Sequence, residues 1–151
     1  VHAFNYIVKP VTQQKVDKIV TQLEEVINAR NDKLTFRYNR ELINAYYDDI
    51  VYMESSKRII NLVTTNMEYQ FYAKINDVYD ELPELIFGKT RSGCIVNYRY
   101  VSRVDKNNVW CKRGIDGTEI RLDLGRGRYN DFMTDYTEYI TSERGKSRRL
   151  W

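Results

Sequence analysis

The basic residues of this sequence are concentrated in three stretches, and clustered Lys and Arg side chains are the groups best suited to bind an anionic partner. The first stretch, residues 89–113, has one acidic residue among its eight charged residues. The second stretch is residues 121–128 and the third is residues 144–149. The formal net charge of +3 is too small to indicate such a partner by itself, so the uneven distribution is the informative feature. A basic surface that is only solvated remains the alternative.

Residues suited to catalysis or metal binding are scarce. The sequence has one histidine, His2, and its two cysteines, Cys94 and Cys111, stand outside any CxxC or histidine-rich context. Cys, His and carboxylate residues do not follow the spacing of metal ligands, and Gly125 and Gly127 lack the glycine pattern of a phosphate-binding loop. We therefore expect no enzyme activity, no metal and no cofactor.

Cysteine usage and hydropathy bear on the cellular compartment. Cys94 and Cys111 fall in strand-like segments, so we expect buried free thiols in a reducing cytoplasm rather than a disulfide. No apolar run reaches the length of a transmembrane helix, and no signal peptide is recognisable. The sequence therefore predicts a cytoplasmic protein without a membrane partner.

Most of the chain between residues 34 and 124 is predicted to be β structure. Tyrosine and β-branched residues favour strands, and the sequence contains thirteen tyrosines. Turn residues occur at 65–66, 107–108 and 116–117, the last pair with the sequence of a type I′ turn. We expect strands within residues 34–38, 48–55, 58–72, 93–104 and 118–124. Short strands at intervals of about ten residues indicate an antiparallel sandwich or barrel.

Two helices are predicted within and after this β region. Apolar residues at helical spacing mark a short helix that stops at Pro83, and a longer amphipathic helix follows Gly125. The apolar positions are Ile75, Val78, Tyr79 and Leu82 in the short helix, and Tyr129, Phe132, Met133, Tyr136 and Ile140 in the final helix.

The first 31 residues have a separate pattern. Residues 4–8 are strand-like, the Lys9-Pro10 pair breaks the strand, and Thr12 is a candidate N-cap for an amphipathic helix. The apolar positions of that helix are Val16, Ile19, Val20, Leu23, Val26 and Ile27. One strand and one helix cannot form a core alone, so we expect this segment to belong to a longer domain or to pack on another chain.

Four blocks of the sequence, in this order, resemble LytTR-type DNA-binding domains of bacterial response regulators. The blocks are DDIVYMES (48–55), EYQFYAKINDVYDELP (68–83), FGKTRSGCIVNYRYVSRVD (87–105) and DGTEIRLDLGRGRYNDF (116–132). The resemblance covers about residues 34–140, and the Val96-Asn97 pair makes it more specific; we expect Asn97 to be structural rather than a DNA contact. It implies a mainly β fold: an elongated antiparallel β sandwich with a short internal helix and a C-terminal helix.

The N-terminal segment resembles the last strand and last helix of a receiver domain. In that comparison, Lys9 is the lysine that contacts the phosphorylated aspartate of receivers. The resemblance implies three parts: a receiver remnant in residues 1–31, a LytTR-like DNA-binding domain in 34–142 and a basic tail in 143–151. A cognate histidine kinase would act through the remainder of the receiver.

For function, the resemblance implies sequence-specific binding of double-stranded DNA by the output domain of a two-component transcriptional regulator. Directly repeated half-sites and loops in the major groove are the implied mode. The candidate DNA-binding residues are Lys57, Arg58, Lys89, Arg91, Ser92, Arg126 and Arg128. Two alternatives remain: a protein-interaction module whose basic face binds an acidic partner, and a binder of single strands or RNA, favoured by the aromatic content.

The sequence departs from the LytTR pattern where base preference would be set. Lys89 stands where the family has an arginine, Arg91 replaces the family histidine, and Ser92 replaces a basic residue. Gly93 and Cys94 replace a serine and an aromatic residue. Basic character is retained, but the base preference of better-known members is not expected to carry over.

The apolar stripe of the N-terminal helix predicts self-association. Four of its residues follow heptad spacing, which suits a contact between helices: Val16, Ile19, Leu23 and Val26. Leaving such side chains in water forfeits about 1.5–3 kcal/mol each relative to full burial. We predict a dimer through residues 13–30, which the double substitution Leu23→Glu/Ile27→Glu should convert to a monomer in light scattering. An unmodified chain that is already monomeric, with the helix folded back on its own domain, would contradict this.

Overall fold

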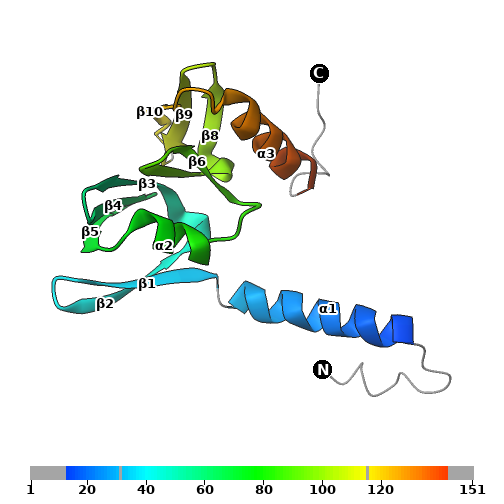
Figure 1. Ribbon diagram of the computed structural model, residues 1–151. Helices are drawn as coiled ribbons and strands as arrows, with labels where there is room; N and C mark the ends of the chain where they lie inside the picture. Colours follow the sequence, from blue (N-terminus) through cyan, green and yellow to red (C-terminus); the bar gives the residue numbers. More distant parts are fainter. Residues whose placement is uncertain (1–12, 31, 115, 143–151) are drawn as a thin grey trace. The chain divides into compact units, whose positions relative to one another are not determined.

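The computed structural model describes residues 13–30, 32–114 and 116–142 (Figure 1). The chain divides into two compact units, residues 1–33 and residues 34–151. Each unit is described by itself, because their relative placement is not determined.

The first unit contains helix α1 (Gln13–Arg30), where the sequence predicted a helix. Val16 and Val20, two residues of its apolar stripe, are 37% and 46% exposed. The predicted strand at residues 4–8, the Lys9-Pro10 turn and the Thr12 cap lie outside the described residues.

The second unit is built on a five-stranded antiparallel sheet with the strand order β5-β4-β3-β7-β6. Its strands are β3 (Ile50–Ser56), β4 (Ile59–Thr64), β5 (Glu68–Tyr72), β6 (Phe87–Arg91) and β7 (Cys94–Asn97). A second antiparallel sheet, in the order β10-β9-β8, contains β8 (Val101–Val104), β9 (Asn108–Arg113) and β10 (Thr118–Asp123). Strands β1 (Lys33–Tyr38) and β2 (Glu41–Tyr46) form a separate hairpin.

The five-stranded sheet is the middle layer, because both of its faces are buried. Along β3, Met53 belongs to one core and its neighbour Tyr52 packs against the other, as the alternation of side chains in a strand requires. A register irregularity between Ile50 and Tyr52 places Val51 in the second core as well. The first core includes Leu34, Phe36, Ile60, Leu62, Val78 and Phe87, from the β1–β2 hairpin, the sheet and α2 (Ile75–Glu81). The second includes Cys94, Val96, Val109, Leu122, Phe132 and Tyr139, from the sheet, the second sheet and α3 (Tyr129–Ser142). The predicted fold class is confirmed: mainly β and antiparallel, with a short internal helix and a C-terminal helix.

The segment expected to be one strand, residues 93–104, is two strands in different sheets. A turn of 3₁₀ helix, η3 (Tyr98–Tyr100), separates β7 from β8 and carries the chain from the middle sheet to the second sheet. Tyr98 is buried against α3, with its ring centroid 5.7 Å from that of Phe132. Strand β7 is buried at all four positions and the 3₁₀ turn buries Tyr98, so apolar residues continue through the break and their pattern does not reveal it.

The side chain of Asn97, at the end of β7, is fully buried and forms three hydrogen bonds at the point where the chain passes between the two sheets. Its Nδ2 donates to the carbonyl oxygens of Tyr47 at 3.0 Å and Ile50 at 2.9 Å. Its Oδ1 accepts from the backbone N–H of Arg99 at 2.9 Å. The expectation that Asn97 is structural is confirmed, because these bonds use the side chain to satisfy buried backbone groups.

Two hairpin turns differ from simple sequence rules. The β1–β2 turn is a two-residue turn in which Asn39 and Arg40 have φ of 50° and 66°, as type I′ requires at both positions. The type I′ turn predicted at residues 116–117 is wrong in type, although a hairpin does turn there. Thr118 pairs with Arg113, so the connection has four residues, and only its glycines have positive φ among those described.

We predict that Asn97→Ala lowers the free energy of unfolding by about 2–4 kcal/mol, because it leaves buried backbone groups without partners. Urea unfolding of the whole chain measures this. Asn44→Ala is the matched control: Asn44 is exposed and accepts one hydrogen bond from Thr35 Oγ1 at 2.7 Å, so its loss should stay within about 0.5 kcal/mol. Equal losses in the two variants would refute a special role for Asn97.

Candidate nucleic-acid interface

Two turns of the five-stranded sheet lie side by side. The β3–β4 turn is residues 57–58, and the β6–β7 turn is residues 92–93. They are adjacent because β3 pairs with β7, and the backbone N–H of Ser55 donates to the carbonyl oxygen of Gly93 at 2.8 Å. Both turns therefore project from the same end of the sheet.

The loop from β10 to α3 joins these turns. The backbone N–H of Gly125 donates to the carbonyl oxygen of Thr90, on β6, at 2.7 Å. A Cβ added to Gly125 would lie 3.4 Å from the Cβ of Arg91, so the loop passes close to the end of β6. We call this part of the domain the basic end, and it comprises residues 57–58, 91–93 and 124–128.

Four of the predicted site residues are exposed at the basic end: Lys57, Arg58, Ser92 and Arg126. Lys57 has a positive φ of 59°, and its carbonyl oxygen accepts a hydrogen bond from Ser55 Oγ at 2.9 Å. The side chains of the β3–β4 turn are thus held outward by a locally fixed backbone, which suits contact with a surface outside the domain.

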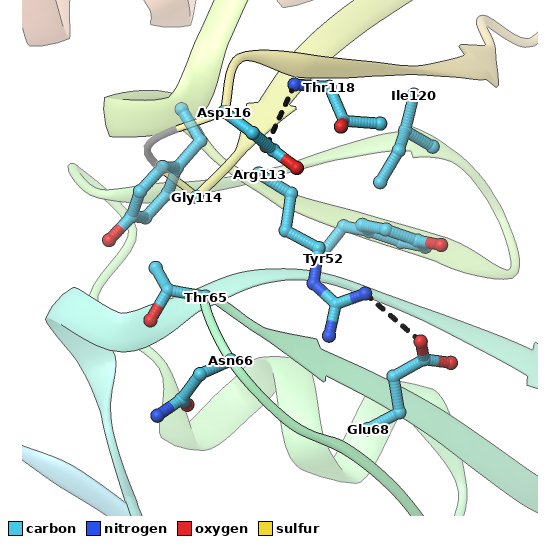
Figure 2. A pocket seen from close by; sticks show the side chains of 10 residues that line it. Tyr52, Thr65, Asn66, Glu68, Arg113, Gly114, Asp116, Thr118 and Ile120 are labelled. Atoms are coloured by element: carbon cyan, nitrogen blue, oxygen red, sulfur yellow. Dashed lines mark hydrogen bonds and ion pairs between the residues drawn. The ribbon is translucent and has the colours of Figure 1, made fainter.

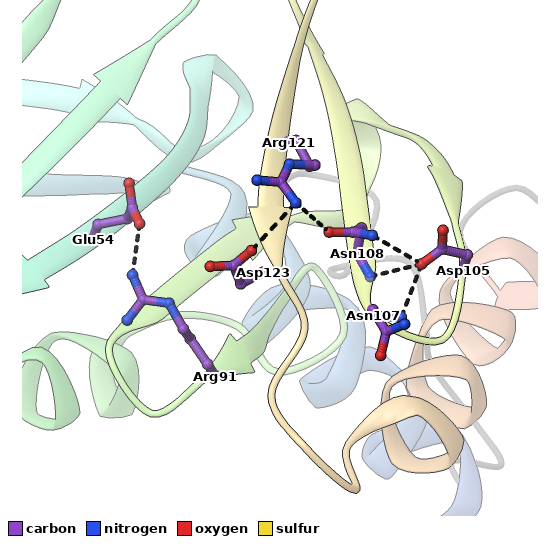
Figure 3. A network of polar contacts seen from close by, with 7 residues as sticks. All are labelled: Glu54, Arg91, Asp105, Asn107, Asn108, Arg121 and Asp123. Atoms are coloured by element: carbon purple, nitrogen blue, oxygen red, sulfur yellow. Dashed lines mark hydrogen bonds and ion pairs between the residues drawn. The ribbon is translucent and has the colours of Figure 1, made fainter.

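Arg91 is half-buried at the same end and is paired with an acidic residue. Its Nη2 lies 2.7 Å from Oε2 of Glu54 on β3, and the two side chains are 36% and 39% exposed (Figure 3). This pair could not be predicted from the sequence, because the two residues are 37 positions apart. The pair uses one donor of the guanidinium and leaves others available.

Lys89 and Arg128 are placed differently from the other candidates. The ammonium of Lys89 donates to Oδ1 of Asn76 in α2 and lies 5.0 Å from the ring centroid of Tyr79. Arg128 packs back on its own loop, with Cδ 3.1 Å from the position of a Cβ on Gly125. Both line a small hollow of about 270 Å³ between α2, β6 and α3, so neither belongs to the exposed turns.

Arg126 is presented by a tight turn before α3. The backbone N–H of Arg128 donates to the carbonyl oxygen of Gly125 at 3.1 Å, and Gly127 has a φ of 76°. A positive φ at the third residue fits a type II turn, in which glycine is favoured. A Cβ at Gly127 would meet no atom within 4 Å, so the turn is open for close approach of another molecule.

Lys106 also lies beside this turn, although sequence reasoning did not single it out. It lines a shallow hollow with Gly127 and Tyr129, and Leu124 donates its N–H to the carbonyl oxygen of Asn107 at 2.9 Å. The carboxylate of Asp105 accepts a hydrogen bond from the backbone N–H of Asn107 and so holds the β8–β9 turn. This hydrogen bond keeps the pKa of the Asp105 carboxyl below its usual value. Lys106 belongs to the first basic stretch of the sequence. Its place beside the β10–α3 turn depends on the contact between that turn and the β8–β9 turn, which the sequence does not reveal.

Arg121 lies on β10 close to the same turn. Its Nη1 donates to Oδ1 of Asn108 at 2.9 Å and lies 3.7 Å from Oδ1 of Asp123 (Figure 3). Both side chains of this ion pair are more than half exposed, so the pair adds little to stability.

Two other arginines of the first basic stretch are used inside the domain. Arg113 donates from Nε to the carbonyl oxygen of Thr64 at 2.8 Å and lies 3.0 Å from Oε2 of Glu68 (Figure 2). Arg103 stacks on the ring of Trp110, 3.9 Å from its centroid, and pairs with Glu119 at 3.2 Å. These arginines are therefore partly neutralised by contacts within the domain.

The end of the domain opposite to the basic end has a different character. It comprises residues 64–68, 113–114 and 116–118, and it surrounds a cleft of about 980 Å³ (Figure 2). Tyr52 and Ile120 line the cleft, and burial raises the pKa of Tyr52 to about 12. Glu68 and Asp116 add carboxylates there, so basic side chains predominate at one end of the strands and not at the other.

The described residues offer little for catalysis. Within residues 13–30, 32–114 and 116–142, no group of three or more His, Cys, Asp or Glu could hold a metal ion. Cys94 and Cys111 are buried free thiols, as predicted, and burial raises their pKa values to about 11 and about 12. No helix in this part of the chain is long and apolar enough to cross a membrane.

Comparison with known proteins agrees with this geometry. The chain is 27% identical over 111 residues to the transcriptional regulatory protein NatR of Bacillus subtilis, a match that covers 67% of this chain and 46% of that protein. The chain thus spans about half the length of this relative.

A solved structure has the same fold. It is the LytTr DNA-binding domain of a protein described as a methyl-accepting/DNA response regulator from Bacillus cereus, with a TM-score of 0.55 and 11% sequence identity. The match covers 70% of this chain and 96% of that one. The family model for the LytTr DNA-binding domain matches residues 40–134, which contain all the turns of the basic end. This chain therefore belongs to the LytTR family of DNA-binding domains.

Proposed function

We propose that the domain binds double-stranded DNA in a sequence-specific manner, as the output domain of a two-component transcriptional regulator. The observation that carries the proposal is the meeting of three turns at the basic end, joined by the Ser55–Gly93 and Gly125–Thr90 hydrogen bonds. Loops that project together from one end can enter a major groove. Directly repeated half-sites are part of the proposal.

The basic residues have different roles in the proposal. Arg91 reads a base pair, because a guanidinium can donate two hydrogen bonds to O6 and N7 of guanine. Arg126 and Lys106 contact phosphates, because they lie in exposed turns and because phosphate contacts make up at least half of protein–DNA hydrogen bonds. Lys57, Arg58 and Ser92 complete the contact surface. Lys89 and Arg128 hold this surface in place without contacting DNA: Lys89 binds Asn76 in α2, and Arg128 packs on the β10–α3 loop.

The alternatives have less support. An acidic protein partner could use the same charges, but the family that the chain matches is one of DNA-binding domains. Binding of single strands or RNA by stacking would need a platform of exposed aromatic rings at the basic end. One exposed ring, that of Tyr72, lies beside the β3–β4 turn, since Tyr72 pairs with Ile59. The rings of Tyr98, Phe132 and Tyr139, which contact one another, lie instead inside the second core.

The parts outside the DNA-binding domain enter the same proposal. Residues 1–31 are a receiver remnant that contains Lys9, residues 34–142 bind DNA, and residues 143–151 are a basic tail. A histidine kinase acts through the remainder of the receiver. Helix α1 pairs with helix α1 of a second copy of this chain, and the exposure of Val16 and Val20 supports this pairing. Two DNA-binding domains linked in this way suit a DNA site with two repeated half-sites.

Substitutions of Arg91 and Arg126 test the proposal. Arg91→Ala is expected to weaken binding to the preferred duplex by about 1–3 kcal/mol and to relax preference at one base pair. Arg126→Ala is expected to weaken binding to all duplexes alike and to reduce the slope of log affinity against log salt by roughly one. Preferred duplexes come from selection in a random library, and fluorescence anisotropy at several salt concentrations gives the affinities.

Lys112→Ala is the charge-matched control for these two variants. Lys112 is exposed on β9, opposite Glu119 of β10 in the strand register and near the end of the strands away from the basic end, so its loss should leave both quantities nearly unchanged. The proposal would be wrong if the unmodified chain bound single strands or RNA as tightly as duplex, or if all three variants behaved alike.

A pair of glycines tests the β10–α3 turn separately from stability. Gly127 and Gly117 have φ of 76° and 73°, and a Cβ at either would meet no atom within 4 Å. Alanine at positive φ costs about 1–2 kcal/mol, so Gly127→Ala and Gly117→Ala should lower the free energy of unfolding by similar amounts. Only Gly127→Ala should weaken duplex binding, because it alters the turn that presents Arg126. Equal effects on binding would mean that this turn does not meet DNA.

A further inference from the structure

The guanidinium of Arg91 lies in a notch between two residues that are not basic. On one side, Oε2 of Glu54 accepts a hydrogen bond from Nη2 at 2.7 Å (Figure 3). On the other side, Nη1 lies only 3.0 Å from the position that a Cβ on Gly93 would occupy. Glu54 and Gly93 are linked in turn, since the residue after Glu54, Ser55, donates its N–H to the carbonyl oxygen of Gly93 at 2.8 Å.

Gly93 has no conformational reason to be glycine. Its φ is outside the left-handed region that favours this residue. A Cβ at position 93 would lie 3.0 Å from Nη1 of Arg91 and 3.6 Å from the carbonyl oxygen of Ser55. The end of an arginine side chain moves more easily than the backbone, so a larger residue at position 93 would displace Arg91.

Positions 91 and 93, at both of which the sequence differs from the LytTR pattern that it resembles, therefore share one space. The sequence has Arg91 where the family has histidine, and Gly93 where the family has serine. The longer side chain at position 91 occupies the space that the side chain at position 93 would fill.

The Glu54–Arg91 pair contributes more to orientation than to stability. The two side chains are 36% and 39% exposed, and ion pairs with such exposure add little to the free energy of unfolding. An unrestrained arginine has many rotamers and must lose this freedom when it binds a base. Glu54 restricts the rotamers before binding, and it uses one of five N–H donors, which leaves Nη1 and the second Nη2 hydrogen for an acceptor pair.

We propose that Glu54 is a positioning residue and that Glu54 and Gly93 together set the orientation in which Arg91 meets a guanine, which makes them determinants of base preference. The inference rests on the proposed function. It deepens that function by assigning preference at one base pair to a set of three residues, two of which do not touch the base.

Conservative substitutions separate orientation from charge. Glu54→Gln keeps the size of the side chain and an oxygen acceptor but removes the charge that holds the guanidinium. Gly93→Ser restores the family residue and displaces Arg91 sterically. Glu68→Gln is the matched control, because Glu68 forms a similar pair with Arg113, at 3.0 Å, at the opposite end of the domain. Urea unfolding of each variant confirms that it is folded.

The measurement is the relative affinity of each variant for duplexes that carry every base pair at every position of the selected site. We expect Glu54→Gln and Gly93→Ser to lose about tenfold of discrimination at the base pair that Arg91→Ala also relaxes. Affinity of Glu54→Gln for random duplex should be unchanged or higher, because a negative charge near DNA is removed. Glu54→Gln/Arg91→Ala should have the same preference as Arg91→Ala alone, and Glu68→Gln should have that of the unmodified chain.

The outcomes distinguish this inference from the function on which it rests. An unmodified chain without any base preference would overturn the proposed function and this inference together. An unmodified chain with a preference that neither Glu54→Gln nor Gly93→Ser changes would overturn the inference alone. So would relaxation at a base pair other than the one assigned to Arg91.

Discussion

The pairing of β3 with β7 is the constraint on which the rest of the domain depends. Both strands lie in the middle layer, and Met53, Val51, Ile95 and Val96 are fully buried on its two faces. A shift of one residue in the register would exchange the two faces of a strand and place every side chain in the wrong core. The register is therefore fixed by packing, and it aligns Tyr52 with Val96 and Glu54 with Cys94. One consequence is that the β3–β4 and β6–β7 turns end side by side, and another is that Glu54 lies within reach of Arg91.

The distribution of charge follows from the same antiparallel arrangement. Successive turns alternate between the two ends of the strands, so the charges that the sequence places on alternate turns are sorted by end. The β3–β4, β6–β7 and β10–α3 connections bring Lys57, Arg91 and Arg126 together, whereas the β4–β5 and β9–β10 turns surround the cleft with Glu68 and Asp116. Arg113 lies at the cleft end, but its charge is partly neutralised by its ion pair with Glu68.

Local features of the sequence predicted much of the fold. The predictions that were wrong or incomplete concern contacts between residues far apart in the sequence. Alternation of apolar residues indicated most of the strands, and helical spacing indicated α2 and α3 close to their observed bounds. The break at η3 was missed because apolar residues continue through it. The family resemblance supplied the candidate site residues, and their role in DNA binding stays a prediction. Sequence could not show that Lys89 reaches Asn76, that Lys106 adjoins Gly127, or that Glu54 holds Arg91.

Backbone amide NMR spectra recorded during addition of the selected duplex test most directly whether the basic end binds DNA. We expect the amide signals of residues 55–58, 91–93 and 125–128 to shift most, and those of residues 64–68 and 116–118, at the cleft, to stay in place. Largest shifts at the cleft, or shifts spread evenly over both ends, would contradict this expectation.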